Sequence, residues 1–165
     1  MDYLWAPWRM PYILSDHDAP GCIFCEKPGE DHDVENGILY RGNTCFVMMN
    51  AYPYNPGHLM VIPYRHAGSL TELPDEELGE LMVITKRSVA VLNDMMAPSG
   101  MNMGINQGRI AGAGIVDHVH QHIVPRWSGD TNFMTTVGHT RVLPEMVDEA
   151  YRQLAPGFSP ESFKG

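Results

Sequence analysis

One stretch decides the fold: His118-Val119-His120-Gln121-His122-Ile123-Val124, with a histidine at every second residue and an apolar pair at its end. Alternate side chains of a β-strand share a face, so the stretch predicts three imidazoles in one row, about 6.6 Å apart. Such a row can supply nitrogen nucleophiles or metal ligands. A solvated strand face or an affinity-tag remnant explains it less well, because apolar residues flank the histidines and a tag would be terminal.

The length of 165 residues suits a single domain over 1–165 with one hydrophobic core. Hydrophobic residues make up 44% of the chain and charged residues 19%, and no run of eighteen apolar residues could span a membrane. Residues 1–5 lack the basic and apolar segments of a signal peptide. We therefore expect a soluble cytoplasmic protein with no membrane partner.

The net charge is −9, from 11 Lys and Arg against 20 Asp and Glu, and acidic residues gather in 72–80 and 145–149. Long nucleic acids are bound through clustered Lys and Arg, so this balance argues against a nucleic-acid partner. A small anionic ligand is compatible with it, because backbone N–H groups can hold an anion whatever the overall charge.

The rest of the sequence predicts an α+β protein. Alternating apolar residues and turn signals predict four further strands, at 38–40, 45–49, 59–62 and 101–106. Apolar residues at helical spacing within 69–94, with Pro74 in the first turn, predict a long core-facing helix, and 144–154 indicates a terminal helix.

Three segments outside these elements also carry expectations. Residues 1–21, with two tryptophans, predict an arm packed on the body or on a second subunit. Residues 26–37 predict a polar loop, and 155–165 a tail that is frayed or wrapped on a partner. Residues 107–114 form a glycine-rich loop whose free N–H groups could face phosphate oxygens, and it leads directly into the histidine stretch.

Cys22 and Cys25 form a C-x-x-C pair. A redox pair of the thioredoxin type needs a βαβ setting, which the surrounding sequence does not predict. Three cysteines also do not make a secreted disulfide framework. Half of a tetrahedral zinc site is the better interpretation, provided that two further Cys or His ligands lie elsewhere.

The histidine stretch resembles the signature of the histidine triad superfamily, His-φ-His-φ-His-φ-φ with φ apolar. Further landmarks of that family are Asn50, the run Pro56 to Pro63, Asn106 with Gly108, and Val124-Pro125-Arg126-Trp127. With Trp5-Ala6-Pro7-Trp8-Arg9-Met10, they are most similar to the bacterial diadenosine tetraphosphate phosphorylase-like branch. The resemblance covers roughly residues 3–152, too much for a chance motif.

The resemblance implies a five-stranded antiparallel sheet with one long helix and a C-terminal helix, in a homodimer that binds a purine nucleotide or dinucleoside polyphosphate above the sheet. It implies that His120 attacks the α-phosphorus to form a nucleotidyl-histidine, while His122 bonds to a phosphate oxygen or passes a proton to the leaving group. Six positions are implied to contact the nucleotide or its phosphates: Asn50, Asn106, Gly108, Ala113, Gly114 and Trp127.

The resemblance also implies a structural zinc site, with no organic cofactor. Zinc-bearing members pair the C-x-x-C with a histidine after the third strand and the first histidine of the triad, which gives Cys22, Cys25, His66 and His118 here. Two thiolates and two imidazoles make a closed, structural site. The alternative is that both cysteines are reduced thiols, as in branches without zinc.

Three departures from the family pattern bear on function. Gln121 occupies an apolar position, Ala113 and Gly114 stand where related phosphorylases have glycine and serine, and His122 stands where older phosphorylases have glutamine. Cleavage of dinucleoside polyphosphates by phosphorolysis or hydrolysis is the function implied first. Nucleoside phosphoramidate hydrolysis and a non-catalytic nucleotide-binding adaptor are the alternatives.

Overall fold

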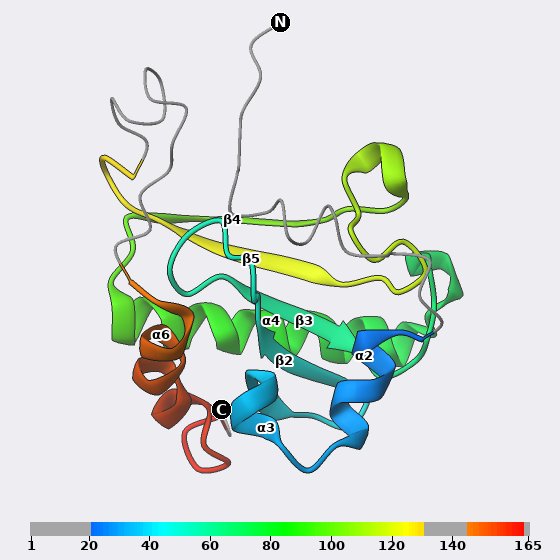
Figure 1. Ribbon diagram of the computed structural model, residues 1–165, viewed down its shortest axis with the longest axis horizontal. Helices are drawn as coiled ribbons and strands as arrows, with labels where there is room; N and C mark the ends of the chain where they lie inside the picture. Colours follow the sequence, from blue (N-terminus) through cyan, green and yellow to red (C-terminus); the bar gives the residue numbers. More distant parts are fainter. Residues whose placement is uncertain (1–20, 131–144, 164–165) are drawn as a thin grey trace, which may run out of the picture.

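A computed structural model of the chain describes residues 21–130 and 145–163, so the arm predicted before Gly21 lies outside the described residues. The described part contains a five-stranded sheet in the order β1-β2-β3-β5-β4, with every neighbouring pair antiparallel (Figure 1). The strands are β1 (Ile38–Arg41), β2 (Cys45–Met49), β3 (Leu59–Pro63), β4 (Gly100–Ile105) and β5 (Gln121–Arg126). The predicted fold class and the positions of four strands are confirmed.

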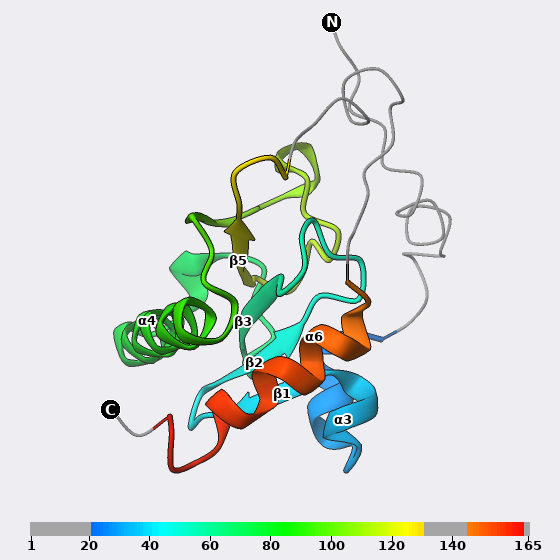
Figure 2. The ribbon, with the colours of Figure 1, turned by 90° about the vertical axis from the view of Figure 1, so that its left-hand side faces the viewer.

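Helix α4 (Asp75–Met96) packs along one face of the sheet, where Figure 2 shows it nearly end-on. Pro74 is the N-cap residue rather than part of the first turn, and three acidic residues follow it near the positive end of the helix dipole. The buried side of α4, including Leu81 and Leu92, meets sheet residues such as Val61 in the largest hydrophobic cluster. This packing leaves the opposite face of the sheet for other elements.

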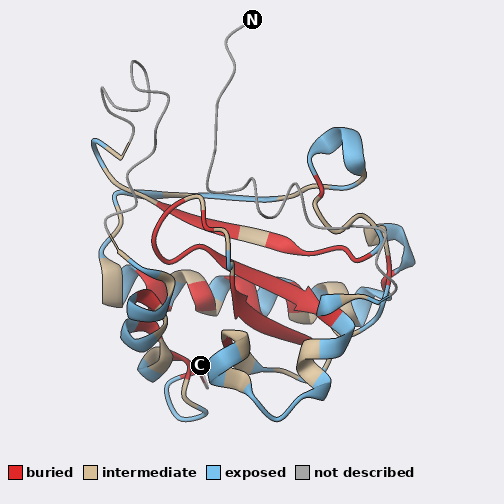
Figure 3. Ribbon diagram, in the orientation of Figure 1, coloured by how far each residue is buried: buried red, intermediate tan, exposed pale blue. Residues whose placement is uncertain are grey.

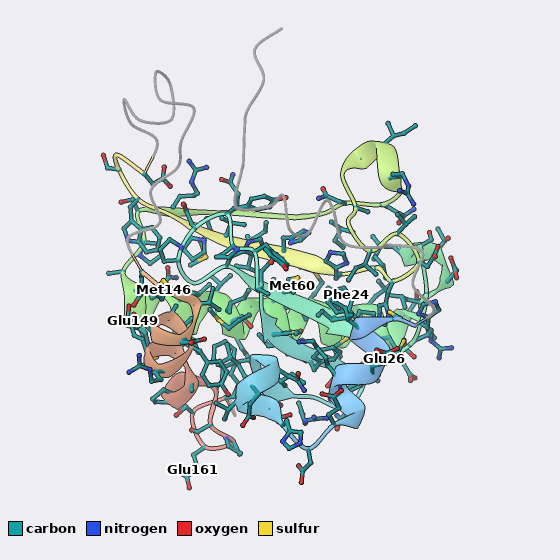
Figure 4. All side chains as sticks on the ribbon, viewed as in Figure 1. Phe24, Glu26, Met60, Met146, Glu149 and Glu161 are labelled. Carbon is teal, nitrogen blue, oxygen red and sulfur yellow. The ribbon has the colours of Figure 1, made fainter. Side chains whose placement is uncertain are left out.

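The opposite face is covered in part by the short helix α2 (Ile23–Glu26). Phe24 of α2 is 2% exposed and packs with Met48 and Met60 of the sheet, and Figure 4 shows Phe24 and Met60 side by side where α2 crosses the strands. The segment predicted as a polar loop therefore contains helical turns: the end of α2, η2 (Lys27–Gly29) and α3 (Asp33–Asn36).

Arg41 at the end of β1 holds these turns in place. Its Nη1 donates to the Pro28 carbonyl at 2.7 Å, and its Nη2 lies 2.6 Å from Asp33 Oδ1. Gly37 ends α3 in the left-handed region with φ of 71°, where residues with a side chain are strained. The exposed polar residues thus tie η2 and α3 to the sheet.

The strand predicted over 118–124 begins later than expected, because β5 starts at Gln121. Extending the β3–β5 register would place Pro63 opposite Val119, and proline has no N–H to donate to the ladder. Val119 N instead donates to the Ala67 carbonyl, beyond β3, at 2.7 Å. The prediction of three histidines in one regular strand is therefore wrong for the first two, which lie just before β5.

The C-terminal residues up to 163 belong to the core, contrary to the expected frayed tail. Helix α6 (Val147–Leu154) is followed by η5 (Ala155–Phe158). Phe158 and Phe163 are each 2% exposed, with ring centroids 5.0 Å apart, and Phe163 also lies 4.2 Å from the ring of Tyr40. Sequence reasoning missed this because two isolated aromatics show no periodicity.

Burial varies strongly across the sheet. Strands β2 and β3 are buried along their whole length, whereas β4 is mostly exposed and forms one edge (Figure 3). Within the described ranges, no helix has the length and apolar character needed to cross a membrane.

Removing the ring of Phe163 tests whether the C-terminal segment stabilises the fold. Phe163→Ala should lower the free energy of unfolding by about 3 kcal/mol, because it empties a buried aromatic site. Urea denaturation followed by circular dichroism measures the change. Glu161→Ala, at an exposed position, is the control and should stay within about 0.5 kcal/mol of the unchanged protein. Equal values for the two variants would contradict a structural role for the segment.

Candidate functional site

A pocket opens on the sheet face opposite α4, between α2 and the loop that precedes β5. Its empty volume is about 680 Å³, and both His120 and His122 line it. Apolar side chains form much of the remaining wall: Ile23, Phe24, Met48, Met49, Ala51, Met60 and Ile115. A pocket with apolar walls and two imidazoles at one side suits an aromatic ligand that carries a reactive anionic group.

His120 is held in one tautomer. Its Nδ1 lies 2.9 Å from the His118 carbonyl oxygen, which can only accept, so Nδ1 carries the proton and Nε2 carries a lone pair. His120 is 4% exposed, and this burial lowers its pKa, partly opposed by the same hydrogen bond. A neutral imidazole with a bare nitrogen is the state required of a nucleophile at neutral pH.

His122 is held by a second chain of hydrogen bonds, which begins at a backbone group. Tyr54 N donates to His58 Nδ1 at 3.0 Å, so the neutral His58 ring carries its proton on Nε2. His58 Nε2 lies 3.0 Å from His122 Nδ1, which must then accept. The contacts thus place the remaining proton of His122 on Nε2 and disfavour the doubly protonated ring. His122 is poised to donate a hydrogen bond rather than to release a proton.

Sequence reasoning did not assign a role to His58, which holds the ring of His122. It is 0% exposed and follows the Pro56-Gly57 turn directly before β3. A lone histidine at such a position is usually a satisfied core residue, and 64 residues separate it from His122. The only sequence signal was its place inside the run Pro56 to Pro63, which matched the family without a role for each residue.

The four predicted metal ligands come together at the other end of the histidine stretch. Cys22, Cys25, His66 and His118 offer ligand atoms that all lie within 4.8 Å of one another. Cys22 Sγ and Cys25 Sγ lie 3.3 and 3.5 Å from His118 Nδ1, and Cys25 Sγ lies 3.3 Å from His66 Nδ1. Tetrahedral bonds to zinc of ordinary length would separate sulfur and nitrogen ligands by about 3.6 Å.

The environment of this cluster also suits a cation. His118 Nε2 donates to the Pro63 carbonyl at 2.8 Å, so its Nδ1 lone pair faces the sulfurs. Burial, the hydrogen bond with Cys22 and the negative charges of Cys22 and Glu26 raise the pKa of Cys25 to about 11. A bound cation reverses such a shift, because a coordinating thiol is deprotonated. The residues present therefore fit a zinc ion.

The nucleotide-binding positions implied by the resemblance are divided in space. Asn50 and Gly114 line the pocket that holds His120. Asn106 instead lines a second pocket on the far side of His122, and its Nδ2 lies 3.5 Å from the Gly112 carbonyl. The other three line neither pocket: Gly108 is the N-cap residue of η4 (Arg109–Ala111) with φ of 84°, Ala113 is 7% exposed, and Trp127 Nε1 donates to the Met96 carbonyl at 3.3 Å.

Comparison with known proteins identifies relatives of this chain. The sequence profile of the family described as "HIT domain" matches residues 32–129. A protein of Mycobacterium tuberculosis named AP-4-A phosphorylase is 39% identical over 160 residues, which cover 92% of this chain and 82% of that protein. A bis(5'-nucleosyl)-tetraphosphatase (asymmetrical) of Schizosaccharomyces pombe is 35% identical over 97 residues, 59% of this chain and 53% of that protein.

The same fold occurs among solved structures. The crystal structure of a Zn-bound histidine triad family protein from Mycobacterium smegmatis aligns with a TM-score of 0.68 and 26% sequence identity. The alignment covers 87% of this chain and 96% of that protein. The likeness confirms the five-stranded antiparallel sheet with helices that the family resemblance implied.

Replacing His58 tests whether it sets the tautomer of His122. In the unchanged protein, ¹⁵N NMR of labelled imidazoles should show His122 neutral with its proton on Nε2, and His120 neutral with its proton on Nδ1. His58→Phe should leave His122 in a mixture of tautomers, because Nδ1 loses its donor, and should not alter His120. His32→Asn, at an exposed position, is the control. An unchanged His122 spectrum in His58→Phe would refute the assignment.

Proposed function

Because the chain belongs to the HIT domain family, we propose that it is an enzyme that cleaves dinucleoside polyphosphates, such as diadenosine tetraphosphate, through a nucleotidyl-histidine intermediate on His120. The observation that carries the proposal is the bare Nε2 of His120 in a pocket that it shares with His122. In this proposal the apolar wall around Phe24 and Met60 accepts the purine ring, and Asn50, which lines the same pocket, bonds to the ribose hydroxyls.

In the first step, His120 Nε2 forms a bond to the α-phosphorus as the bond to the leaving polyphosphate oxygen breaks. The proton on His120 Nδ1 stays in its hydrogen bond to the His118 carbonyl, so the ring becomes positively charged while it carries the nucleotidyl group. The leaving polyphosphate departs as an anion and needs no proton. His122 donates its Nε2 hydrogen bond to a phosphate oxygen, and the N–H group of Gly114, which lines the same pocket, stabilises the developing charge.

In the second step, an acceptor oxygen attacks the same phosphorus and the bond to His120 Nε2 breaks, which restores the neutral ring. Inorganic phosphate already carries negative charge and needs no base, whereas water must lose a proton. A neutral His122 whose Nδ1 is occupied by His58 is poorly placed to take that proton. We therefore favour phosphorolysis. The name of the M. tuberculosis relative agrees with this choice, and that of the S. pombe relative keeps hydrolysis as the alternative.

Two other functions are alternatives to this proposal. Nucleoside phosphoramidate hydrolysis would use the same nucleophile on a phosphorus–nitrogen bond. A non-catalytic nucleotide-binding adaptor would use the pocket alone, and Gly114, which lacks the serine hydroxyl of related phosphorylases, favours this reading. His120, which lines the pocket and keeps a lone pair on Nε2, favours an enzyme over the adaptor.

Product analysis separates these functions. With diadenosine tetraphosphate, we expect ADP and ATP only when inorganic phosphate is present. AMP and ATP without phosphate would mean hydrolysis, and turnover of adenosine 5'-phosphoramidate alone would mean the second function. His120→Ala should lower kcat by about a thousandfold or more and should still bind the nucleotide. Persistent turnover by this variant would refute His120 as the nucleophile.

We further propose that Cys22, Cys25, His66 and His118 hold a structural zinc ion. The ligand atoms have the spacing and the donor types of a closed tetrahedral site, and the similar M. smegmatis structure is described as Zn-bound. When bound, zinc would supply a crosslink between α2, the residues after β3 and the start of the histidine stretch. It takes no part in the bond changes at phosphorus.

Metal analysis tests this site without an activity measurement. Purified protein should contain about one zinc per chain, and a chelator should lower its melting temperature. Cys22→Ser should lose the zinc and melt earlier. Cys45→Ala, which removes the third cysteine at a fully buried position outside the cluster, should keep its zinc whatever its stability. Far less than one zinc per chain in the unchanged protein would overturn the proposal.

The homodimer implied by the family resemblance is part of the same proposal. Among the described strands, β4 has a neighbour on one side only, and Met103 on it is 54% exposed. A strand edge of this kind can pair with a second copy.

A further inference from the structure

One row of residues crosses the sheet face that carries the active site. The strand registers align Met48 with Met60, Met60 with His122, and His122 with Gly104. His122 therefore stands between two halves of this face. On the β2 and β3 side the row is made of methionine, and on the β4 side it ends at a glycine. The two halves should accept chemically different parts of one ligand.

The β4 half contains the second pocket, with an empty volume of about 720 Å³. Eight residues line it: Tyr54, Asn102, Met103, Gly104, Asn106, His122, Val124 and Arg126. None of these eight carries a carboxylate, although the whole chain has a net charge of −9. Tyr54 and His122 also line the first pocket, so the two pockets meet at these residues.

The second pocket presents hydrogen-bond donors. Arg126 bonds to Asp130 through Nε and Nη2, at 2.6 and 2.9 Å, and to Asn102 Oδ1 through Nη1 at 2.7 Å. A guanidinium has five N–H groups, and these three contacts leave one on each terminal nitrogen. Because Asn102 Oδ1 accepts from Arg126, the Asn102 amide is oriented, and its N–H groups have no acceptor among the described residues. Asp130 and Asn102 thus fix the position of the Arg126 guanidinium. Its two remaining N–H groups and those of the Asn102 amide are available to a ligand.

Gly104 forms the floor of this pocket next to His122. A Cβ built on Gly104 meets no atom within 4 Å, and its backbone is not in the left-handed region. No feature of the described packing therefore requires glycine here. The absence of a side chain instead leaves room directly beside the imidazole that faces the substrate.

We propose that the second pocket binds the part of the substrate that leaves: the polyphosphate chain and the nucleotide beyond the attacked phosphorus. This inference rests on the proposed function. In an in-line displacement the leaving oxygen lies opposite the nucleophile. His120 lines the first pocket, and His122 lines both pockets. The polyphosphate of the substrate therefore extends past His122 into the second pocket, where Asn102 and Arg126 offer hydrogen-bond donors. Asn106 stands at the same boundary, near the loop that faces the reacting phosphate.

The test compares ligands that fill one pocket or both. In a His120→Ala background, which prevents turnover, calorimetry should show that diadenosine tetraphosphate binds at least about tenfold more tightly than AMP. Adding Gly104→Val should remove about tenfold or more of the affinity for diadenosine tetraphosphate and change that for AMP less than about twofold, because the new side chain fills only the second pocket. Valine also suits a strand.

Gly100→Val is the matched control. It places the same side chain on the same strand, where a Cβ again meets no atom within 4 Å, outside the residues that line the pocket. Because Gly100 pairs with Arg126, it should leave the affinity for AMP unchanged and lower that for diadenosine tetraphosphate far less than Gly104→Val does. Asn102→Asp provides a second variant: it keeps an oxygen acceptor for Arg126 but replaces the free N–H donors with negative charge. It should weaken diadenosine tetraphosphate binding and spare AMP.

The outcomes distinguish a failure of this inference from a failure of the proposed function on which it rests. Equal affinities for AMP and diadenosine tetraphosphate in the His120→Ala background would overturn the second pocket as a binding site and leave the nucleophile untouched. Equal losses for both ligands in Gly104→Val and in Asn102→Asp would also overturn it. If neither ligand binds, the proposed function fails and the inference fails with it.

Discussion

The hydrogen bond from His120 Nδ1 to the His118 carbonyl is the contact on which the site depends. It spans only two residues, yet it joins the cysteine and histidine cluster to the ring of the proposed nucleophile. The ring of His118 is held between the cluster and the Pro63 carbonyl, so its backbone is held as well. Whatever orders His118 therefore also orders the tautomer and direction of His120.

Phe24 reinforces this connection from the opposite side. Its ring meets His118 at a centroid distance of 5.4 Å and His120 at 4.9 Å, and in both pairs the rings meet edge to face. Because Phe24 lies between Cys22 and Cys25, the C-x-x-C segment contributes two thiols to the cluster and one apolar wall to the pocket. A crosslink at the cluster would thus stabilise the pocket wall and the nucleophile together, without taking part in the reaction.

The three histidines differ in role because each ring has a different partner. His118 donates to a carbonyl and offers its other nitrogen to the sulfurs, His120 donates to a carbonyl and leaves Nε2 bare, and His122 accepts from His58. Equal spacing in the sequence does not make equal chemistry. The partner of each nitrogen, rather than the motif, decides whether that ring serves as ligand, nucleophile or hydrogen-bond donor.

The sequence by itself determined the fold class, the positions of four strands, the long helix and the four residues of the cysteine and histidine cluster, and it singled out His120 as the proposed nucleophile. Periodicity and family motifs are formed by residues that are close together in the sequence, so they can be recognised without the structure. The tertiary structure alone decided the late start of β5, the burial of Phe158 and Phe163, the part played by His58, and the division of the sheet face at His122. Each of these depends on contacts between residues distant in sequence, such as Val119 N with the Ala67 carbonyl or Gly104 facing His122. No local pattern records such contacts.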